Sequence, residues 1–263
     1  MSDLRWAHNQ GFISHLPCYN TIFNIFQNDE ITDTLTCLIE RSASPLEPFE
    51  HTFAIDSSTF PASRLSPPSI HVKRPGRKPK KEFGQHDWVK AHLAAGVLTN
   101  IVTAVVIRDR NASDSKQFPS LLKTTSKTFL IEEVVADKAY SGKTNTRLVA
   151  EMGAVPYLLY KGNAAGGGGG MWEKMFDEFQ VHKEDYLAHY HQRSNVESTF
   201  SMLKRKFAEG VRSRSDTAMK NETLCKVLCH NIVVLIHAMY ELGIDPVFWP
   251  DTPNKPAKGS RIV

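Results

Sequence analysis

The chain has 263 residues, of which 41% are hydrophobic and 23% are charged, and its formal net charge is +4. This composition excludes a wholly disordered protein, and the length allows one large or two small globular domains. The excess of basic over acidic residues is small, so it is compatible with a polyanionic partner without requiring one.

The sequence favours a cytoplasmic protein that does not enter a membrane. Its first ten residues lack the apolar core of a signal peptide, and its longest apolar run, residues 232–236, is too short to cross a bilayer. The four cysteines form no CxxC pair, which is typical of a reducing compartment. Cys225 and Cys229 lie beside His230, but no second ligand pair has zinc spacing, so a structural role is favoured over a zinc site.

In chain order, residues 1–48 are predicted to form a helical N-terminal segment, with a helix start at Asn28-Asp29-Glu30 and a break at Ser44-Pro45-Leu46-Glu47-Pro48. Short apolar runs predict five strands, at residues 51–56, 88–98, 101–107, 134–137 and 155–160. The turn Thr99-Asn100 predicts a hairpin between the second and third strands. Helical patterns predict four further helices, at residues 118–127, 143–152, 190–207 and 216–242.

Three segments are predicted to lie outside the regular core. Residues 61–87 form a basic, proline-rich loop, and positions 73–81 within it hold six lysines and arginines. Residues 162–171 form a glycine-rich loop, and residues 246–263 form a flexible tail. The order of the remaining elements predicts an α/β domain over residues 49–245, with a mixed β-sheet flanked by helices on both faces.

Two acidic residues end apolar strands in this pattern. Asp56 closes Phe-Ala-Ile-Asp, and Asp137 closes Val-Val-Ala-Asp. A carboxylate at the end of so apolar a run is costly to desolvate unless it meets a cation or a hydrogen-bond donor. A single such residue is more often a turn residue, but two of them make a shared site plausible if their strands are neighbours.

A third element places a charged stripe beside a buried stripe on one helix. Tyr190, Arg193, Glu197 and Lys204 fall within about 60° of one another on a helical wheel. A separate apolar stripe borders them, formed by Val196, Phe200, Leu203 and Phe207. Because a solvated charge run would normally lie opposite the core, this arrangement favours a functional site.

The spacing Tyr190-x2-Arg193-x3-Glu197-x6-Lys204 resembles the signature of bacterial insertion-sequence DDE transposases. Ala54-Ile-Asp56-Ser-Ser and Val135-Ala-Asp137-Lys-Ala-Tyr140 are similar to the first and second acidic motifs of that family. Further similar landmarks are Trp88-Val-Lys90-Ala-His92, Asn221-Glu222 and His230-Asn231. The resemblance covers roughly residues 10–245, and its four-residue signature is the most specific part.

The resemblance implies a ribonuclease-H-like catalytic domain in which Asp56, Asp137 and Glu197 are the catalytic metal ligands. The expected cofactors are two Mg²⁺ ions, for which Mn²⁺ can substitute, because hard cations prefer carboxylate oxygens. In the implied reaction, water cleaves a phosphodiester to release a 3′-OH, which then attacks target DNA. The expected partners are double-stranded DNA, at the element ends and the target, and a second copy of the chain in a homodimer.

The resemblance also assigns residues to DNA. Tyr190, Arg193 and Lys204 are expected to hold the element end through its phosphates, Arg193 by a bidentate contact and Lys204 as a point charge. In the basic loop, the residues expected to contact the DNA backbone are Lys73, Arg74, Arg77 and Lys78. A solvated loop is the alternative for this segment.

The chain also departs from the family. Only 55 residues precede Asp56, fewer than the upstream DNA-binding region of family members usually takes. We therefore expect an N-terminally truncated or split transposase, with residues 1–48 a remnant of that region. Two alternative functions stay open: a ribonuclease-H-like nuclease without strand transfer, and a truncated or domesticated protein that only binds DNA.

Three other residue types have two interpretations each. Asp114 is favoured as a cap or turn residue over a fourth acidic ligand. His182, His189 and His191 offer a histidine metal site, but the carboxylates explain metal binding better. Trp172 is favoured as a hydrophobic anchor for the glycine-rich loop over a platform that stacks on a flipped base.

Overall fold

The structure is a computed structural model that describes residues 2–62, 88–109 and 111–248. Its centre is a five-stranded sheet of order β3-β2-β1-β4-β5. The strands are β1 (Thr52–Pro61), β2 (Trp88–Gly96), β3 (Val102–Asp109), β4 (Glu133–Ala136) and β5 (Val155–Leu158). The β1–β2 and β2–β3 pairs are antiparallel, whereas β1–β4 and β4–β5 are parallel, so the predicted mixed sheet is confirmed.

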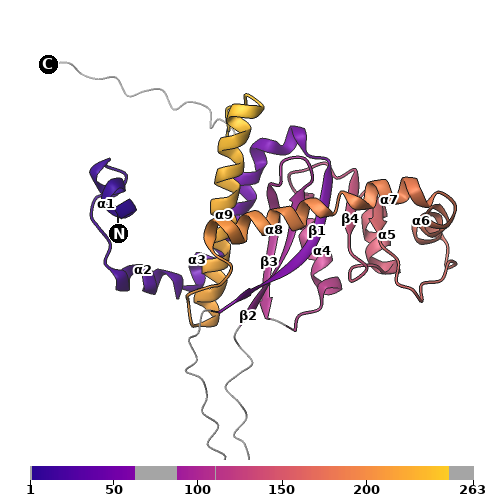
Figure 1. Ribbon diagram of the computed structural model, residues 1–263, viewed down its shortest axis with the longest axis horizontal. Coiled ribbons are helices and arrows are strands. Elements are labelled where there is room, and N and C mark those ends of the chain that lie inside the picture. The colour runs from indigo at the N-terminus through magenta and orange to yellow at the C-terminus, as the bar shows by residue number, and fades with distance from the viewer. Residues whose placement is uncertain (1, 63–87, 110, 249–263) are drawn as a thin grey trace, which may run out of the picture.

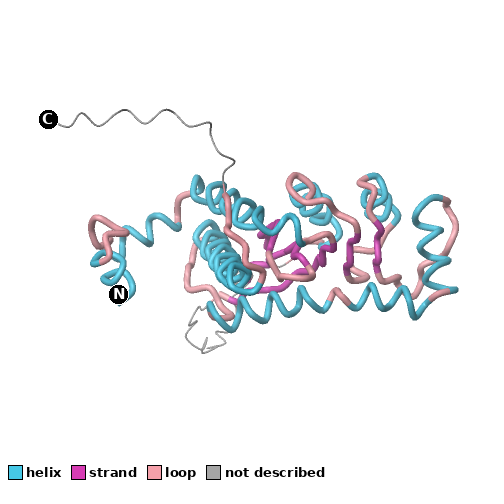
Figure 2. The backbone as a smooth tube through the Cα atoms, turned by 90° about the horizontal axis from the view of Figure 1, so that it is seen from above, coloured by secondary structure: helices cyan, strands magenta, loops and turns pink. Residues whose placement is uncertain are grey.

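Helices cover both faces of the sheet, as predicted, and Figure 2 shows the strands between two helical layers. The helices are α1 (Ser2–Asn9), α2 (Tyr19–Phe26), α3 (Asp29–Ala43), the 3-10 helix η1 (Ser44–Phe49), α4 (Asp114–Thr125), α5 (Lys143–Glu151), α6 (Gly170–Val181), α7 (Lys183–His191), α8 (Ser194–Phe207) and α9 (Asp216–Glu241). The core on one face joins β1, β3 and β4 to α4, α5 and the second half of α9. The core on the other face joins the sheet to α3, α8 and the first half of α9.

The two faces of β1 follow from its side-chain alternation. Phe53 and Ile55 lie in the core on the α4 side, whereas Ala54 and Phe60 lie in the core on the α8 side. Successive side chains of a strand point to opposite faces. Asp56 therefore belongs to the α8 face, and Ser57 belongs to the α4 face.

The N-terminal helices are tied to α9 by two buried asparagines. The Asn221 side chain donates to the carbonyl oxygens of Phe26 and Asn28 and accepts from the Thr32 hydroxyl. The Asn231 side chain accepts from the Val102 amide. It also donates to Ser42 Oγ and to the Val102 carbonyl. Asn221 and Asn231 thus hold the fold together. Helix α3 packs against α9 and the sheet, whereas α1 and α2 extend away from the sheet (Figure 1).

The β2–β3 turn is built around a buried glutamate. The Glu50 carboxylate accepts from the Leu98 and Thr99 amides and from the Thr99 hydroxyl. A Cβ atom at Gly96 would overlap the Glu50 side chain, so this position requires glycine. Asn100 completes the turn with a φ of 63°. The predicted hairpin is confirmed, and its conformation depends on a carboxylate far from it in the sequence.

The structure corrects four expected elements. The strand expected to end at Asp56 continues to Pro61, so Asp56 lies within β1 and not at its end. The helix expected from residue 118 begins at Asp114, so Pro119 lies inside it and not in its first turn. Two helices, α6 and α7, occupy residues 170–191, where only a loop and the start of the signature helix were expected. The signature helix itself begins at Ser194, not at residue 190. Most of the predicted basic loop and most of the predicted tail lie outside the described residues.

Candidate active site

Asp56 and Asp137 follow directly paired residues on neighbouring parallel strands. The β1–β4 ladder runs from Thr52 opposite Glu133 to Ile55 opposite Ala136. Asp56 and Asp137 come next on their two strands, with both side chains directed to the α8 face by the alternation of the strands. Neighbouring strands lie about 4.8 Å apart, so the sheet itself brings these two carboxylates close together.

Arg193 joins Asp56 to Glu197. Its Nη1 lies 2.7 Å from Asp56 Oδ2, and its Nη2 lies 2.6 Å from Glu197 Oε1. The Arg193 and Asp56 side chains are only 19% and 21% exposed, whereas Glu197 is 55% exposed. One guanidinium group thus bridges two carboxylates that are 141 residues apart in the chain, Asp56 and Glu197. Such charge-assisted hydrogen bonds are among the stronger polar contacts in proteins.

The bridge depends on a helical turn that was not expected. The helix direction changes little between α7 and α8, but the amides of Arg193, Asn195 and Val196 bond to carbonyl oxygens three residues earlier. Tyr190 therefore ends α7, Arg193 is the residue before α8, and Glu197 and Lys204 lie on α8 itself. The four signature residues still line one side, as predicted, although they do not share one regular helix.

The electrostatic environment of Asp56 reflects all three acids. Burial raises the pKa of the Asp56 carboxyl above its ordinary value, and the charges of Asp137 and Glu197 raise it further. The Ser57 amide and Arg193 act in the opposite direction without reversing the shift. A carboxylate whose ionised form is disfavoured in this way gains from an additional cation nearby.

A groove of about 600 Å³ separates β1 from α8 beside these acids. Its lining includes Asp56, Ser58, Glu197, Lys204 and Arg205. Lys204 Nζ donates to Ser58 Oγ at 2.8 Å and lies 5.5 Å from the centre of the Phe60 ring. The groove therefore combines acidic side chains, Glu209 among them, with two basic side chains of α8.

The donor set of this site suits a hard divalent cation. Carboxylate oxygens are the ligands that Mg²⁺ and Mn²⁺ prefer, and three carboxylates against one guanidinium leave a net negative charge. Arg193, however, lies between Asp56 and Glu197 as an internal cation. Within residues 2–62, 88–109 and 111–248, no group of three His, Cys, Asp or Glu side chains is arranged as a ready-made metal cage. A cation bound by both Asp56 and Glu197 would compete with Arg193 for their oxygens.

The remaining residues expected to contact DNA are placed as follows. Tyr190 is 8% exposed, and its ring centre lies 5.8 Å from Arg193 Cζ. Burial raises the pKa of the Tyr190 hydroxyl, and the charges of Asp137 and Asp56 also raise it. Tyr190, Arg193 and the acids are therefore brought together, with Lys204 along the groove. Lys73, Arg74, Arg77 and Lys78 lie outside the described residues.

A polar cluster that the sequence did not predict lies on the opposite face of the sheet. Asp114 was favoured there as a cap or turn residue, which is wrong, because Ser113 holds the cap position of α4. The Asp114 carboxylate instead contacts Lys90, His92 and Ser57. The alternation Lys90-Ala-His92 on a strand was the available signal, since it places two polar side chains on one otherwise apolar face.

The histidines and Trp172 have structural partners. His189 Nδ1 lies 3.0 Å from Glu133 Oε2, and its ring stacks on Tyr157. His182 Nδ1 lies 3.1 Å from Glu178 Oε1. Trp172 is 9% exposed, and its indole donates to the Ala165 carbonyl oxygen, so its interpretation as an anchor of the glycine-rich loop is confirmed.

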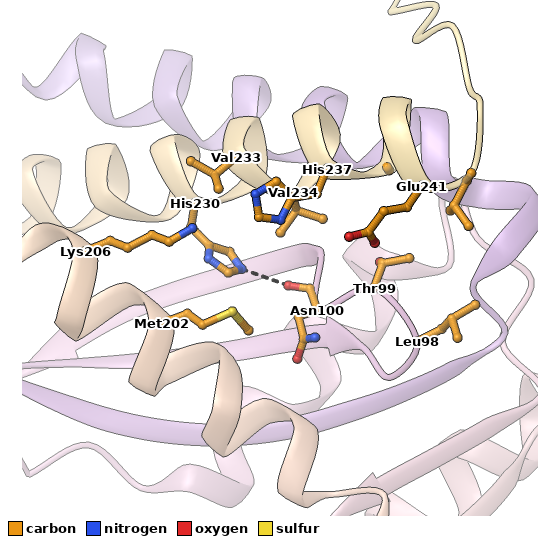
Figure 3. A pocket seen from close by; sticks show the side chains of 12 residues that line it. Leu98, Thr99, Asn100, Met202, Lys206, His230, Val233, Val234, His237 and Glu241 are labelled. Carbon is orange, nitrogen blue, oxygen red and sulfur yellow. Dashed lines mark hydrogen bonds between the residues drawn. The ribbon is translucent and has the colours of Figure 1, made fainter.

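A separate cavity of about 320 Å³ lies between α8, α9 and the β2–β3 turn (Figure 3). His230 Nε2 donates to the Asn100 carbonyl oxygen there, and burial lowers the pKa of this imidazole, which keeps it neutral. Met202, His237 and Glu241 are among the other lining residues. The cavity shares no residue with the acidic groove, so Asp56 and Glu197 do not line it.

A mixed sheet of this order, with two acids just beyond the last residue pair of the parallel β1–β4 ladder and a third on a covering helix, is an α/β domain of the ribonuclease-H-like class. The family model of the transposase DDE domain matches residues 47–232, which is more than two thirds of the chain. The chain therefore belongs to the transposase DDE domain family, and the predicted family and fold class are confirmed. The search of curated proteins gave no match.

Membership of this family gives the general function. Its members are transposases, which transfer nucleotidyl groups, bind DNA and generally use divalent metal ions. One described helix, α9, is long and apolar enough to cross a membrane, but half of that stretch is buried inside the fold, as in a core helix of a soluble protein.

Proposed function

We propose that this chain cuts and joins DNA at the ends of an insertion sequence, with Asp56, Asp137 and Glu197 as its catalytic residues. The observation that carries the proposal is the convergence of these acids from two adjacent strands and one helix, with a single arginine bridging Asp56 and Glu197. Core packing does not explain why three acids so far apart in the sequence lie together. A cation-dependent site requires several negative charges close together, and these three carboxylates supply them.

The three acids would hold two Mg²⁺ ions, or Mn²⁺ in their place. Bound there, the ions would supply Lewis-acid charge that activates the attacking oxygen and neutralises the leaving oxygen of an in-line displacement. Asp56 and Asp137 are held by the sheet, whereas Glu197 reaches them from α8. The half-exposed Glu197 is thus the acid that can move most easily towards the other two.

The proposed chemistry balances without a side-chain nucleophile. In the first step, a water oxygen bonds to phosphorus and the bond from phosphorus to the 3′ oxygen breaks, which leaves a 3′-OH on the element end and a 5′-phosphate on the flanking DNA. In the second step, that 3′ oxygen bonds to a target phosphorus, and the target 3′ oxygen leaves. The protein orients the strands and stabilises charge at the phosphate that reacts.

Basic and aromatic groups beside the acids are suited to hold DNA. Arg193 has the fork geometry for a phosphate once the acids release it, and Lys204 supplies a point charge along the groove. Tyr190 packs against Arg193 and limits its orientation. The basic residues of the loop, Lys73, Arg74, Arg77 and Lys78, would extend this contact along the backbone.

The proposal includes a homodimer, because two element ends must be joined together, and action in the cytoplasm in association with the nucleoid. The alternatives are a nuclease without strand transfer and a protein that only binds DNA.

A strand-transfer assay separates these functions. A duplex that carries a free 3′-OH end should be joined to a plasmid target in the presence of Mg²⁺. Hydrolysis without joining would favour a nuclease. DNA binding without any nicking would favour a protein that only binds DNA. In the same assay, Asp137→Ala should abolish metal-dependent nicking.

Glu197→Gln tests the least constrained of the three assignments. The substitution removes one charge and keeps the shape of the side chain, so we expect a loss of cleavage of at least about a hundredfold, with DNA binding largely unchanged. Electrophoretic mobility of a labelled duplex measures the binding. Cleavage at the wild-type rate would refute the role of Glu197.

A further inference from the structure

We infer that Asp114 and Ser57 form a positioning pair that holds Asp56 from the opposite face of the sheet. This inference rests on the proposed function, because it concerns how the first catalytic acid is fixed. Ser57 is the residue after Asp56 on β1, and its side chain emerges on the α4 face. It is therefore the closest point at which the α4 face can act on the acid site.

The contacts form a continuous path. The Ser57 amide donates to Asp56 Oδ1 at 2.8 Å, and the Ser57 hydroxyl donates to Asp114 Oδ1 at 2.9 Å. Lys90 Nζ lies 2.6 Å from the same oxygen of Asp114. Three elements thus meet at one carboxylate, since Ser57 belongs to β1, Lys90 to β2 and Asp114 to the first position of α4.

The surroundings of Asp114 hold its carboxylate in place. The Asp114 and Lys90 side chains are 22% and 17% exposed, so the pair is largely withdrawn from water. His92 is fully buried, with Nδ1 3.3 Å from Asp114 Oδ1, and burial lowers the pKa of this imidazole to about 4. A neutral His92 adds no charge, which leaves Lys90 as the cation that balances Asp114.

The need for such support follows from the sheet. The β1–β4 ladder ends at Ile55 opposite Ala136, so from Asp56 onwards β1 is hydrogen-bonded on its β2 side. Asp56 therefore stands where the strand has lost one neighbour. The bond from the Ser57 hydroxyl to α4 restrains the peptide whose N–H holds Asp56 Oδ1. That restraint remains when Arg193 leaves Oδ2, so it matters most in the metal-bound state.

The test is Mn²⁺ binding by the full chain, measured by calorimetry and by the electron paramagnetic resonance signal of free Mn²⁺. Ser57→Ala and Asp114→Asn should each weaken Mn²⁺ binding about tenfold, since groups that orient metal ligands typically contribute this much to affinity. The Mn²⁺ affinity of the double variant should also be about tenfold lower than that of wild type and not lower still, because both changes break the same path.

Two controls separate positioning from a general loss of structure. Ser57→Thr keeps the hydroxyl and should restore affinity to within about threefold of wild type. Thr59→Val removes a hydroxyl from the same face of the same strand and should leave binding unchanged. Circular dichroism melting establishes that each variant is folded, and Ser57→Ala is the smallest change should Asp114→Asn fail to fold.

The outcomes are distinct. If wild type binds Mn²⁺ and folded Ser57→Ala binds it equally well, the positioning role is overturned while the proposed metal site stands. Additive losses in the double variant would also overturn the shared path. If wild type binds no Mn²⁺ with or without a DNA duplex, the metal site itself is refuted, and this inference falls with it.

Discussion

Arg193→Gln should have opposite effects on the stability of the metal-free protein and on its affinity for metal. In the metal-free state, Arg193 makes two short ion pairs, at 2.7 Å to Asp56 and 2.6 Å to Glu197. Hydrogen bonds to charged groups contribute about 1.5–3 kcal/mol each when they are buried. Glu197 is 55% exposed, so its pair contributes much less than the pair with Asp56.

The net loss of stability should be about 2 kcal/mol, most of it from Asp56, whose carboxylate would remain in a poorly solvated place without its partner. For a chain of this size, that corresponds to a melting temperature lower by about 5 °C. Differential scanning calorimetry in the presence of a chelator measures it. Arg205→Gln is the matched control, because Arg205 lies on α8, which begins one residue after Arg193, and lines the groove but is exposed.

Mn²⁺ binding should change in the other direction. In wild type, an entering ion must displace Arg193 from at least one carboxylate, whereas in Arg193→Gln it meets acids that have no internal cation. We expect Mn²⁺ to bind about tenfold more tightly to the variant, which corresponds to about 1.4 kcal/mol. Calorimetric titration gives this value. Unchanged or weaker Mn²⁺ binding by folded Arg193→Gln would refute the view that Arg193 and the metal compete for the same oxygens.

Three further predictions concern other parts of the chain. Replacing the six basic residues of 73–81 by glutamine should weaken DNA binding and reduce the slope of log K against log salt, and an unchanged slope would mean that this segment does not touch phosphate. Because burial lowers the pKa of His92 to about 4, the folded state resists its protonation. The contribution of His92 to the free energy of unfolding, about 3 kcal/mol in total, is present above pH 6.5 and is lost as the pH falls towards 4. Urea unfolding against pH should show that this loss is absent in His92→Asn and retained in the control His237→Asn. Gly96→Ala should lower the free energy of unfolding by about 1–3 kcal/mol, because the added methyl group meets a buried carboxyl group. Gly162→Ala, where nothing lies within 4 Å, should change it little in the same urea experiment.

Much of the sheet was predictable because its signals are local. Each strand contains a short apolar run, the Thr99-Asn100 turn marks the hairpin, and Asp137 follows the end of β4, whereas β1 continues past Asp56 to Pro61. The pairing of β1 with β4 was only a hypothesis from sequence, since it joins residues about 80 positions apart. The register that sets Asp56 beside Asp137 is a tertiary property of the sheet.

The helical part was less predictable, for identifiable reasons. The glycine run obscured the start of α6 at Gly170, because glycine is a poor helix former. The periodicity of residues 190–207 continues through the turn at Arg193, so a helical wheel could not reveal the change from α7 to α8. The polar contacts of Asp114 were missed because they lie on three separate elements, and a sequence pattern reports only neighbours along the chain.

The sequence singled out the acids and Arg193 that the structure brings together, but it did not predict their partners. Arg193 was expected to hold DNA, and in the structure it bridges two acids. Nothing in the spacing of the signature indicates this contact, because Asp56 comes from a distant strand. The pairing becomes visible only when the two faces of β1 are known.

The parallel ladder between β1 and β4 sets the spacing of two of the three acids. Main-chain hydrogen bonds fix the gap between Asp56 and Asp137, so substitutions in surrounding side chains leave it almost unchanged. Glu197 has no such constraint, because α8 packs on the sheet through side chains. Its buried apolar residues in that core are Val196, Phe200 and Leu203. Under the proposed function, activity would therefore be most readily adjusted by repacking α8, which would shift Glu197 relative to Asp56 and Asp137.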